Sequence, residues 1–292
     1  MKNNVINKNF GTKNIITCDN VKVSVGSKKH PTILIDNFNY SFEKGKVYAI
    51  IGNSGVGKTS LVSCISGLTK TKFGDIYIKD KYILARDKKI KQYKAIRKSV
   101  GIVFQFPEYQ LFKDTVEKDI AFGPINYHVN KEDAKKLASK YMYLVGLDYL
   151  LLKANPFDLS NGQKRLVAIA GVLALETDVV IFDEPTAGLD PFYQKKILNI
   201  IKSLAKQGRT VIIITHNMDN VLELADQVLV LGNKSLIKSG TPYEIFNDNQ
   251  LINNIGIELP HVIVEARKYP NILAQQPRNL DELVAFLKKG GI

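Results

Sequence analysis

A glycine-rich run followed by a lysine and a threonine is the part of the chain that points most directly to chemistry. Residues 52–59 read Gly-Asn-Ser-Gly-Val-Gly-Lys-Thr and match the pattern G-x-x-x-x-G-K-[ST]. Glycines let backbone N–H groups turn inward around phosphate oxygens, and a helix that begins at the loop adds a favourable dipole. Lys58 can reach the outer phosphates, and the Thr59 hydroxyl can bind Mg²⁺. Because a predicted strand precedes the run and a predicted helix follows it, we expect a phosphate site rather than an unliganded turn.

Two carboxylates at the end of another predicted strand could complete such a site. The apolar run 179–182 leads directly into Asp183 and Glu184, and Asp183 lies 125 positions after Lys58 (183 − 58). Open α/β sheets bind ligands at the carboxyl ends of their strands. Asp183 would hold Mg²⁺ directly or through water, and Glu184 would accept a proton from the attacking water or position it. Alone the pair could be acidic turn residues, but with the glycine-rich run it predicts a P-loop nucleoside triphosphatase.

A third motif makes this class more specific. Residues 159–163 read Leu-Ser-Asn-Gly-Gln and precede a predicted helix, which Ser160 can cap while the helix N-terminus faces an anion. The motif resembles the Leu-Ser-Gly-Gly-Gln signature of the ABC ATPase family. Gln105 stands at the family's Q-loop position, residues 187–190 at its D-loop position, and His216 at its switch-histidine position.

The resemblance covers about residues 15–245 and implies a role for each matching residue, with ATP and Mg²⁺ as the bound groups. The phosphates would be bound by Gly52, Asn53, Ser54, Gly55, Val56, Gly57, Lys58, Thr59 and Ser60. Mg²⁺ would be held by Thr59, Gln105 and Asp183. Glu184 would orient the hydrolytic water, and His216 would contact the γ-phosphate. Ser160, Gly162 and Gln163 would bind the γ-phosphate of an ATP held by a partner subunit.

The chain departs from the family pattern at two positions. Asn161 replaces the first glycine of the signature, and we expect the loop to survive because asparagine tolerates left-handed backbone angles. Val25 stands where the family usually has an aromatic residue that stacks on adenine. This second difference puts the preference for adenine over guanine in doubt.

Segments beyond the shared motifs look like the ATPases of energy-coupling factor transporters. The matching runs are 104–112 (Phe-Gln-Phe-Pro-Glu-Tyr-Gln-Leu-Phe), 119–124 (Asp-Ile-Ala-Phe-Gly-Pro), 167–174 and 186–191. Phe-Pro-Glu after Gln105 resembles the second of the two ATPase types in such complexes. The resemblance implies a complex that imports vitamins or trace metals, with a second ABC ATPase, a transmembrane scaffold subunit and substrate-binding membrane subunits as partners. We expect a heterodimer with the second ATPase, with a homodimer as the alternative.

Strand-like and helix-like segments alternate along most of the chain and predict the α/β class. We expect a parallel-sheet core with an antiparallel β edge, as in a P-loop ABC cassette, over residues 1–246. A helical subdomain would be inserted at about 106–172. Residues 247–292 would form a small α-rich domain, to which the resemblance gives the role of dimerisation. The alternative for this tail is local packing on its own cassette.

Charge, cysteine content and hydropathy restrict the partners, the covalent or metal cross-links and the membrane segments that the chain could have. The net charge of +13 could attract nucleic acid, nucleotides or an anionic membrane face, and does not choose among them. Two distant cysteines make a disulfide framework or a zinc site improbable. The N-terminus lacks an apolar signal core, and the longest apolar run, 166–175, is too short to cross a bilayer. These properties predict a cytosolic or peripheral protein, and the transporter resemblance implies a peripheral position on the cytoplasmic side of the cell membrane.

Two other ABC classes compete with the transporter interpretation. A nucleic-acid or ribosome-associated ABC protein would fit the positive charge. Chromosome and break-repair members carry a long coiled coil between the glycine-rich run and the signature, but this interval lacks sustained heptads here. Translation-factor members carry two cassettes in one chain, whereas this chain has one. An ATPase of iron–sulfur assembly fits less well with the Q-loop region and the tail. We therefore expect no nucleic-acid partner.

Overall fold

The computed structural model describes residues 13–27 and 30–289 of the 292-residue chain. The polar N-terminal segment and the outer ends of both predicted domains fall in residues 1–12 and 290–292, outside the described residues, as do residues 28–29. The strands are β1 Asn14–Gly26, β2 Pro31–Glu43, β3 Val47–Ile51, β4 Phe73–Ile78, β5 Lys81–Leu84, β6 Val100–Val103, β7 Val179–Asp183, β8 Thr210–Ile214, β9 Gln227–Gly232 and β10 Ser235–Gly240. The α-helices are α1 Lys58–Ile65, α2 Tyr93–Ser99, α3 Val116–Asn126, α4 Lys131–Leu144, α5 Asn161–Leu173, α6 Pro191–Lys206, α7 Met218–Leu224, α8 Pro242–Phe246, α9 Asn249–Ile255, α10 His261–Ala266, α11 Pro270–Leu273 and α12 Leu280–Lys289. Short 3-10 turns span Pro107–Gln110, Tyr149–Lys153 and Pro156–Asp158.

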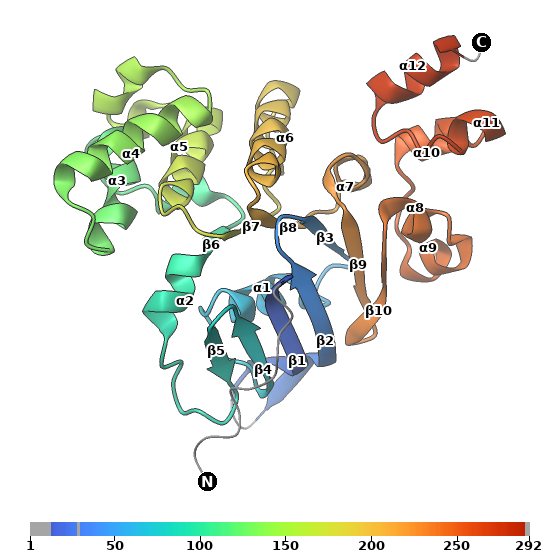
Figure 1. Cartoon of the computed structure of the whole chain (residues 1–292), viewed down its shortest axis with the longest axis horizontal. Helices are drawn as coiled ribbons and strands as arrows, with labels where there is room; N and C mark the ends of the chain where they lie inside the picture. The colour runs from blue at the N-terminus through green and yellow to red at the C-terminus, as the bar shows by residue number, and fades with distance from the viewer. Residues whose placement is uncertain (1–12, 28–29, 290–292) are drawn as a thin grey trace.

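A six-stranded sheet forms the centre of the molecule (Figure 1). Its strand order is β10-β9-β3-β8-β7-β6, and the pairs β3–β8, β3–β9, β6–β7 and β7–β8 are parallel. Within this sheet, as far as the structure describes it, only the edge strand β10 runs antiparallel to its neighbour. Parallel neighbours need crossover connections, and helices supply them here. The predicted α/β class with a parallel-sheet core is confirmed.

Side chains of the central sheet alternate between two cores, because successive residues of a strand point to opposite faces. Along β3, Val47, Ala49 and Ile51 join the core shared with α5, α6 and α7. Tyr48 and Ile50 join the other core, which includes α1 and the second sheet. Both faces of the sheet are therefore covered, which explains why its strands read as continuous apolar runs.

The second sheet is antiparallel throughout, with the order β2-β1-β4-β5, so the predicted antiparallel β edge is also confirmed. Strand β1 contains a bulge. Its register shifts between Cys18 and Val21, where Asn20 has φ 50°, and this bulge interrupts the alternation that marks a strand in sequence.

Helices gather at two opposite sides of the molecule (Figure 1). Between β6 and β7 the chain forms α3, α4 and α5, and after β10 it forms α8 to α12. Buried side chains of the C-terminal helices, such as Val262, Ile263 and Leu283, belong to the same core as α6 and α7. In the described part of the chain, no helix is long and apolar enough to cross a bilayer.

Candidate nucleotide site

The glycine-rich run forms a tight loop between β3 and α1. Gly52 has φ 144° and Gly57 has φ 103°, angles that favour glycine. A Cβ atom on Gly52 would collide with the carbonyl oxygen of Leu231 on β9. The loop therefore requires glycine for space as well as for backbone conformation. Helix α1 begins directly after the loop at Lys58, so its N-terminal dipole favours an anion there.

Lys58 is the first residue of α1, and its side chain reaches back to the loop. Its Nζ donates to the carbonyl oxygens of Gly52 at 2.6 Å and Asn53 at 2.9 Å. Burial lowers the pKa of Lys58, and the carboxylates of Glu184 and Asp183 act against this by raising it. The loop and both predicted carboxylates therefore share one electrostatic environment.

Thr59 and Asp183 meet although they are 124 positions apart. The Thr59 hydroxyl donates to Asp183 Oδ2 at 2.8 Å. Asp183 ends strand β7 and is buried, and this burial is the main cause of its raised pKa. Gln105, which follows β6, lines the same cavity. Hydroxyl, carboxylate and amide oxygens are the hard donors that Mg²⁺ prefers, so this group of residues fits that ion.

Glu184 and His216 face one another at the carboxyl ends of β7 and β8. Glu184 adopts φ 49°, an uncommon angle for a residue with a side chain, and its N–H donates to the carbonyl of Ile214 at 2.9 Å. Its Oε1 is buried without a hydrogen-bond partner in the described structure and lies 3.5 Å from His216 Nε2. Burial is the main cause that raises the pKa of Glu184 and lowers the pKa of His216. A carboxylate held in this way can accept a proton from water.

One open cavity of ≈ 530 Å³ brings most of these groups together. Its lining includes Ser54, Gly55, Gly57, Lys58, Thr59, Ser60, Gln105, Asp183, Glu184 and His216. Gly52, Asn53 and Val56 belong to the same loop without lining the cavity. Val25, at the end of β1, does not line it either, whereas Leu34 does.

The signature residues lie elsewhere, at the N-terminus of α5. Ser160 Oγ accepts from the Gln163 N–H, and the Gln163 side chain accepts from the Ser160 N–H, which forms a capping box. Neither these residues nor Gly162 lines the 530 Å³ cavity. Asn161 is the first helical residue and its φ is not positive, so tolerance of left-handed angles is not the reason that asparagine fits.

Arg165 is a residue that the sequence analysis did not single out. It is only 2% exposed, and it donates from Nε and Nη2 to the two carboxylate oxygens of Glu108 at 3.0 and 2.7 Å. Its Nη1 donates to the carbonyls of Pro185 and Ala187. The guanidinium therefore joins the signature helix to the segments after Gln105 and after Glu184. An arginine directly before the apolar run 166–175 was the signal available in the sequence.

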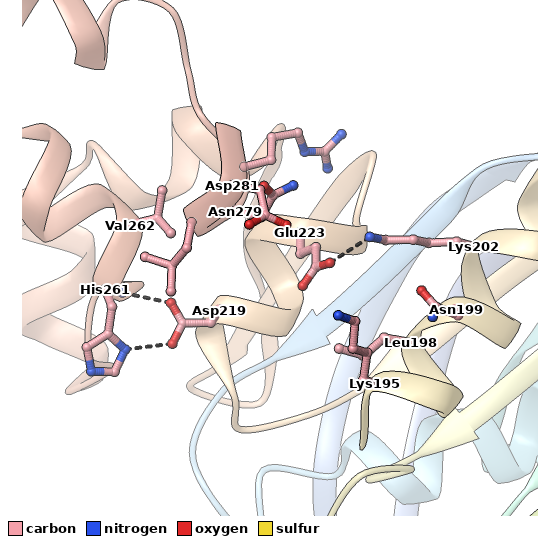
Figure 2. Close-up of a pocket in the computed structure, with 12 residues that line it drawn as sticks. Lys195, Leu198, Asn199, Lys202, Asp219, Glu223, His261, Val262, Asn279 and Asp281 are labelled. Atoms are coloured by element: carbon pink, nitrogen blue, oxygen red, sulfur yellow. Dashed lines mark hydrogen bonds and ion pairs between the residues drawn. The ribbon is translucent and has the colours of Figure 1, made fainter. Parts of the chain in front are cut away.

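A second cavity, of ≈ 590 Å³, lies between α6, α7 and the C-terminal helices (Figure 2). On one side, Asp219 accepts from the backbone N–H of His261 at 2.7 Å and lies 2.6 Å from its Nδ1. On the other side, Lys202 pairs with Glu223 at 2.6 Å. Arg278 donates to the carbonyls of Leu222 and Ala225 at the end of α7. The contacts of His261 and Arg278 attach the C-terminal helices to α7, which follows His216.

Fold and site together define an ATP-binding cassette of the P-loop type. Residues 35–187 match the family model described as ABC transporter. The chain is 52% identical over 261 residues to the energy-coupling factor transporter ATP-binding protein EcfA2 of Mycoplasma pneumoniae, covering 87% of this chain and 86% of the relative. It is 49% identical to the protein of the same name from Mycoplasma genitalium, covering 89% and 88%. The chain belongs to the energy-coupling factor transporter ATP-binding proteins of the ABC transporter family, and it is an ATPase.

Solved structures agree with this assignment. The structure of cbiO1 from Clostridium perfringens, described as part of the ABC transporter complex cbiONQ, has a TM-score of 0.71 at 32% identity and covers 87% of this chain and 99% of that one. A dimeric bacterial ABC transporter cassette has a TM-score of 0.69 at 25% identity and covers 78% and 98%.

Proposed function

We propose that this chain hydrolyses ATP with Mg²⁺ and thereby drives an energy-coupling factor transporter that takes up vitamins or trace metals. The observation that carries the proposal is the gathering of Lys58, Thr59, Asp183, Glu184 and His216 around one cavity, while the signature faces elsewhere. Because the cavity residues and the signature of one chain lie apart, a second cassette is needed to bring a signature to the nucleotide.

In this proposal the loop residues hold the phosphates of ATP and Lys58 neutralises part of their charge. Glu184 holds the attacking water and accepts its proton, for which its raised pKa makes it a better base. His216, with a lowered pKa, presents a neutral imidazole to the γ-phosphate near pH 7. Thr59, Gln105 and Asp183 would hold Mg²⁺, which neutralises charge on the phosphates when bound.

The second cassette would place its own signature over this nucleotide, and Ser160, Gly162 and Gln163 of this chain would cover the partner's nucleotide. The likeness to a dimeric ABC transporter cassette supports this arrangement. ATP can drive closure only because the closed pair binds it more tightly than the open pair does. Among the relatives, the name EcfA2 supports pairing with a related ATPase rather than with a second copy.

The membrane subunits would bind at the Q-loop region of the helical insertion. Exposed aromatic side chains gather here: Phe112 packs edge-on against Phe122 with centroids 4.8 Å apart, and Tyr109 is 85% exposed. The ammonium of Lys113 lies over both phenylalanine rings. A face of this kind is typical of a protein interface. The transmembrane scaffold subunit is its proposed occupant, and substrate-binding membrane subunits complete the complex. This chain would lie at the periphery of the membrane, on its cytoplasmic side.

Residues 247–292 would hold the two ATPases together. Helix α12 supports this role because Leu280 and Val284, four positions apart on one side of the helix, are both exposed while Leu283 packs inward. An exposed apolar pair of this kind can bind a second protein.

Affinity purification of the tagged chain from detergent-solubilised membranes at moderate salt tests the proposal. We expect a multi-span scaffold protein and a second ABC ATPase to be recovered and identified by mass. Recovery of ribosomes or DNA without an integral membrane partner would overturn it, and the charge of +13 would then become the leading observation.

A further inference from the structure

Tyr193 of α6 lies directly over the signature. A Cβ atom on Gly162 would collide with the ring of Tyr193, so the ring covers this glycine at close contact, and Gly162 is buried as a result. The position of the ring is set by the start of α6, where Asp190 Oδ1 accepts from the N–H groups of Phe192 and Tyr193 at 2.9 and 3.1 Å. A tyrosine of α6 therefore packs against the N-terminus of α5.

The hydroxyl of Tyr193 lies beside that of Ser160. The distance between Ser160 Oγ and Tyr193 Oη is 3.5 Å, which is too long for a strong bond between them. Ser160 Oγ accepts one hydrogen bond, from the Gln163 N–H at 3.3 Å, and this leaves its own proton to be donated. Two hydroxyl donors thus stand side by side at a helix N-terminus.

Contacts with Lys196 and Phe192, both on α6, hold the Tyr193 ring in place. Lys196 Nζ lies 4.8 Å from the ring centroid of Phe192 and 5.9 Å from that of Tyr193, and it donates to the carbonyl of Gly146 at 2.8 Å. Phe192 packs edge-on against Tyr193 with centroids 5.3 Å apart. These contacts restrict the ring, so its hydroxyl is held in place before a ligand arrives.

We propose that Tyr193 is a further nucleotide-binding residue, which donates a hydrogen bond from its hydroxyl to the γ-phosphate of the ATP bound by the partner cassette. This inference rests on the proposed function, in which the signature covers that nucleotide. A terminal phosphoryl group presents several charged oxygens, so Ser160 and Tyr193 can each donate to a different one. ADP lacks this group, and the contribution of Tyr193 is therefore specific to the nucleoside triphosphate.

Closure of the two cassettes on the nucleotide, called pairing in this experiment, tests the proposal. It is followed in the full-length chains by energy transfer between fluorophores on this chain and on its partner ATPase, which also reports closure of chains that their C-terminal helices already hold together. The pair is titrated with a non-hydrolysable ATP analogue that retains the γ-phosphoryl group, and ADP binding is measured separately. Tyr193→Phe should raise the analogue concentration for half-maximal pairing roughly tenfold, as expected for one lost hydrogen bond to a charged group, and leave ADP affinity unchanged. Tyr143→Phe is the matched control, because Tyr143 is exposed on α4 and loses the same hydroxyl.

Ser160→Ala separates this inference from the proposed function. If Ser160→Ala weakens pairing and Tyr193→Phe does not, Tyr193 is no ligand of the phosphate and the sandwich still stands. Weaker pairing for Tyr193→Ala but not for Tyr193→Phe would mean that only the packing of the ring matters, and this would overturn the inference. Tighter pairing of Tyr193→Phe would mean that the hydroxyl obstructs the nucleotide. If the analogue drives no pairing of the unmodified chain, the proposed function itself fails.

Discussion

Glu184 combines an unusual backbone angle with a buried oxygen that no side chain satisfies. Its φ of 49° costs free energy, and its Oε1 has been taken out of water without receiving a hydrogen bond in the described structure. The Ile214 carbonyl holds its backbone at the end of β8. Local strain and an unsatisfied acceptor at one residue support the proposed role of Glu184 in holding a water molecule.

Replacing this carboxylate by an amide tests its role. Glu184→Gln should lower hydrolysis at the nucleotide site of this chain by a factor of at least about 10², because the amide cannot accept the proton. ATP should still bind, since the phosphate loop is unchanged. Phosphate release and nucleotide retention measure the two effects, with Glu223→Gln on α7 as the control. Turnover retained in Glu184→Gln would remove Glu184 from the mechanism.

At the scale of elements, Arg165 connects three segments that carry residues of the candidate nucleotide site and of the signature. Glu108 follows the Q-loop residue, Pro185 and Ala187 follow Glu184, and Arg165 itself lies on the signature helix. A buried charge with all its partners in place is tolerated, but a buried charge left alone is costly. Movement of one segment should therefore displace the other two, because Arg165 must keep its hydrogen bonds.

Arg165→Ala should lower the free energy of unfolding by about 3–5 kcal/mol, because it leaves the Glu108 carboxylate buried without its partner. Denaturant-induced unfolding measures this change, and Lys164→Ala on the same helix is the control. Replacing both members, as in Glu108→Met with Arg165→Met, should restore part of the loss. A loss for Arg165→Ala no larger than that of the control would show that the pair does not stabilise the fold.

The contact between α7 and α10 should depend on pH. Asp219 raises the pKa of His261 above its ordinary value of 6.5, chiefly through the hydrogen bond between them. The contact therefore stabilises fully below about pH 6.5 and is lost as the pH rises through the folded-state pKa. The difference in Tm between the unmodified chain and His261→Gln should be larger at pH 5.5 than at pH 8.5. An equal difference at both pH values would contradict this.

At the scale of the whole molecule, the C-terminal helices both pack on the cassette and present a surface of their own. Val262, Ile263 and Leu283 belong to the core that includes α7. Deleting residues 250–292 is expected to weaken pairing with the partner ATPase, but it would also uncover this core. A surface substitution separates the two effects.

Val284→Asp on α12 provides that substitution. We expect pairing with the partner ATPase to weaken roughly tenfold, because a charge replaces an apolar contact at the interface. Tm should stay unchanged, because Val284 is exposed. Asn271→Asp, at an exposed position of the same segment, is the control. Analytical ultracentrifugation measures the pairing of both variants, and thermal unfolding measures their Tm. Unchanged pairing would assign the C-terminal helices to local packing.

The chemistry of the site could be predicted from sequence because each of its motifs is local. A glycine-rich loop between a strand and a helix, or two carboxylates at a strand end, already specifies which atoms are presented and in what direction. Parallel strands of one sheet then bring Lys58, Asp183 and His216 together, since their carboxyl ends meet at one edge.

Other contacts were decided only by the tertiary structure. Arg165 and Glu108 are 57 positions apart, His261 and Asp219 are 42 apart, and Tyr193 and Ser160 are 33 apart. No local pattern relates these residues, because the packing angles of helices and loops, and not the sequence period, determine which side chains meet. The sequence therefore predicted which residues form the candidate nucleotide site, whereas the structure alone showed which side chains connect that site to the signature and to the C-terminal helices.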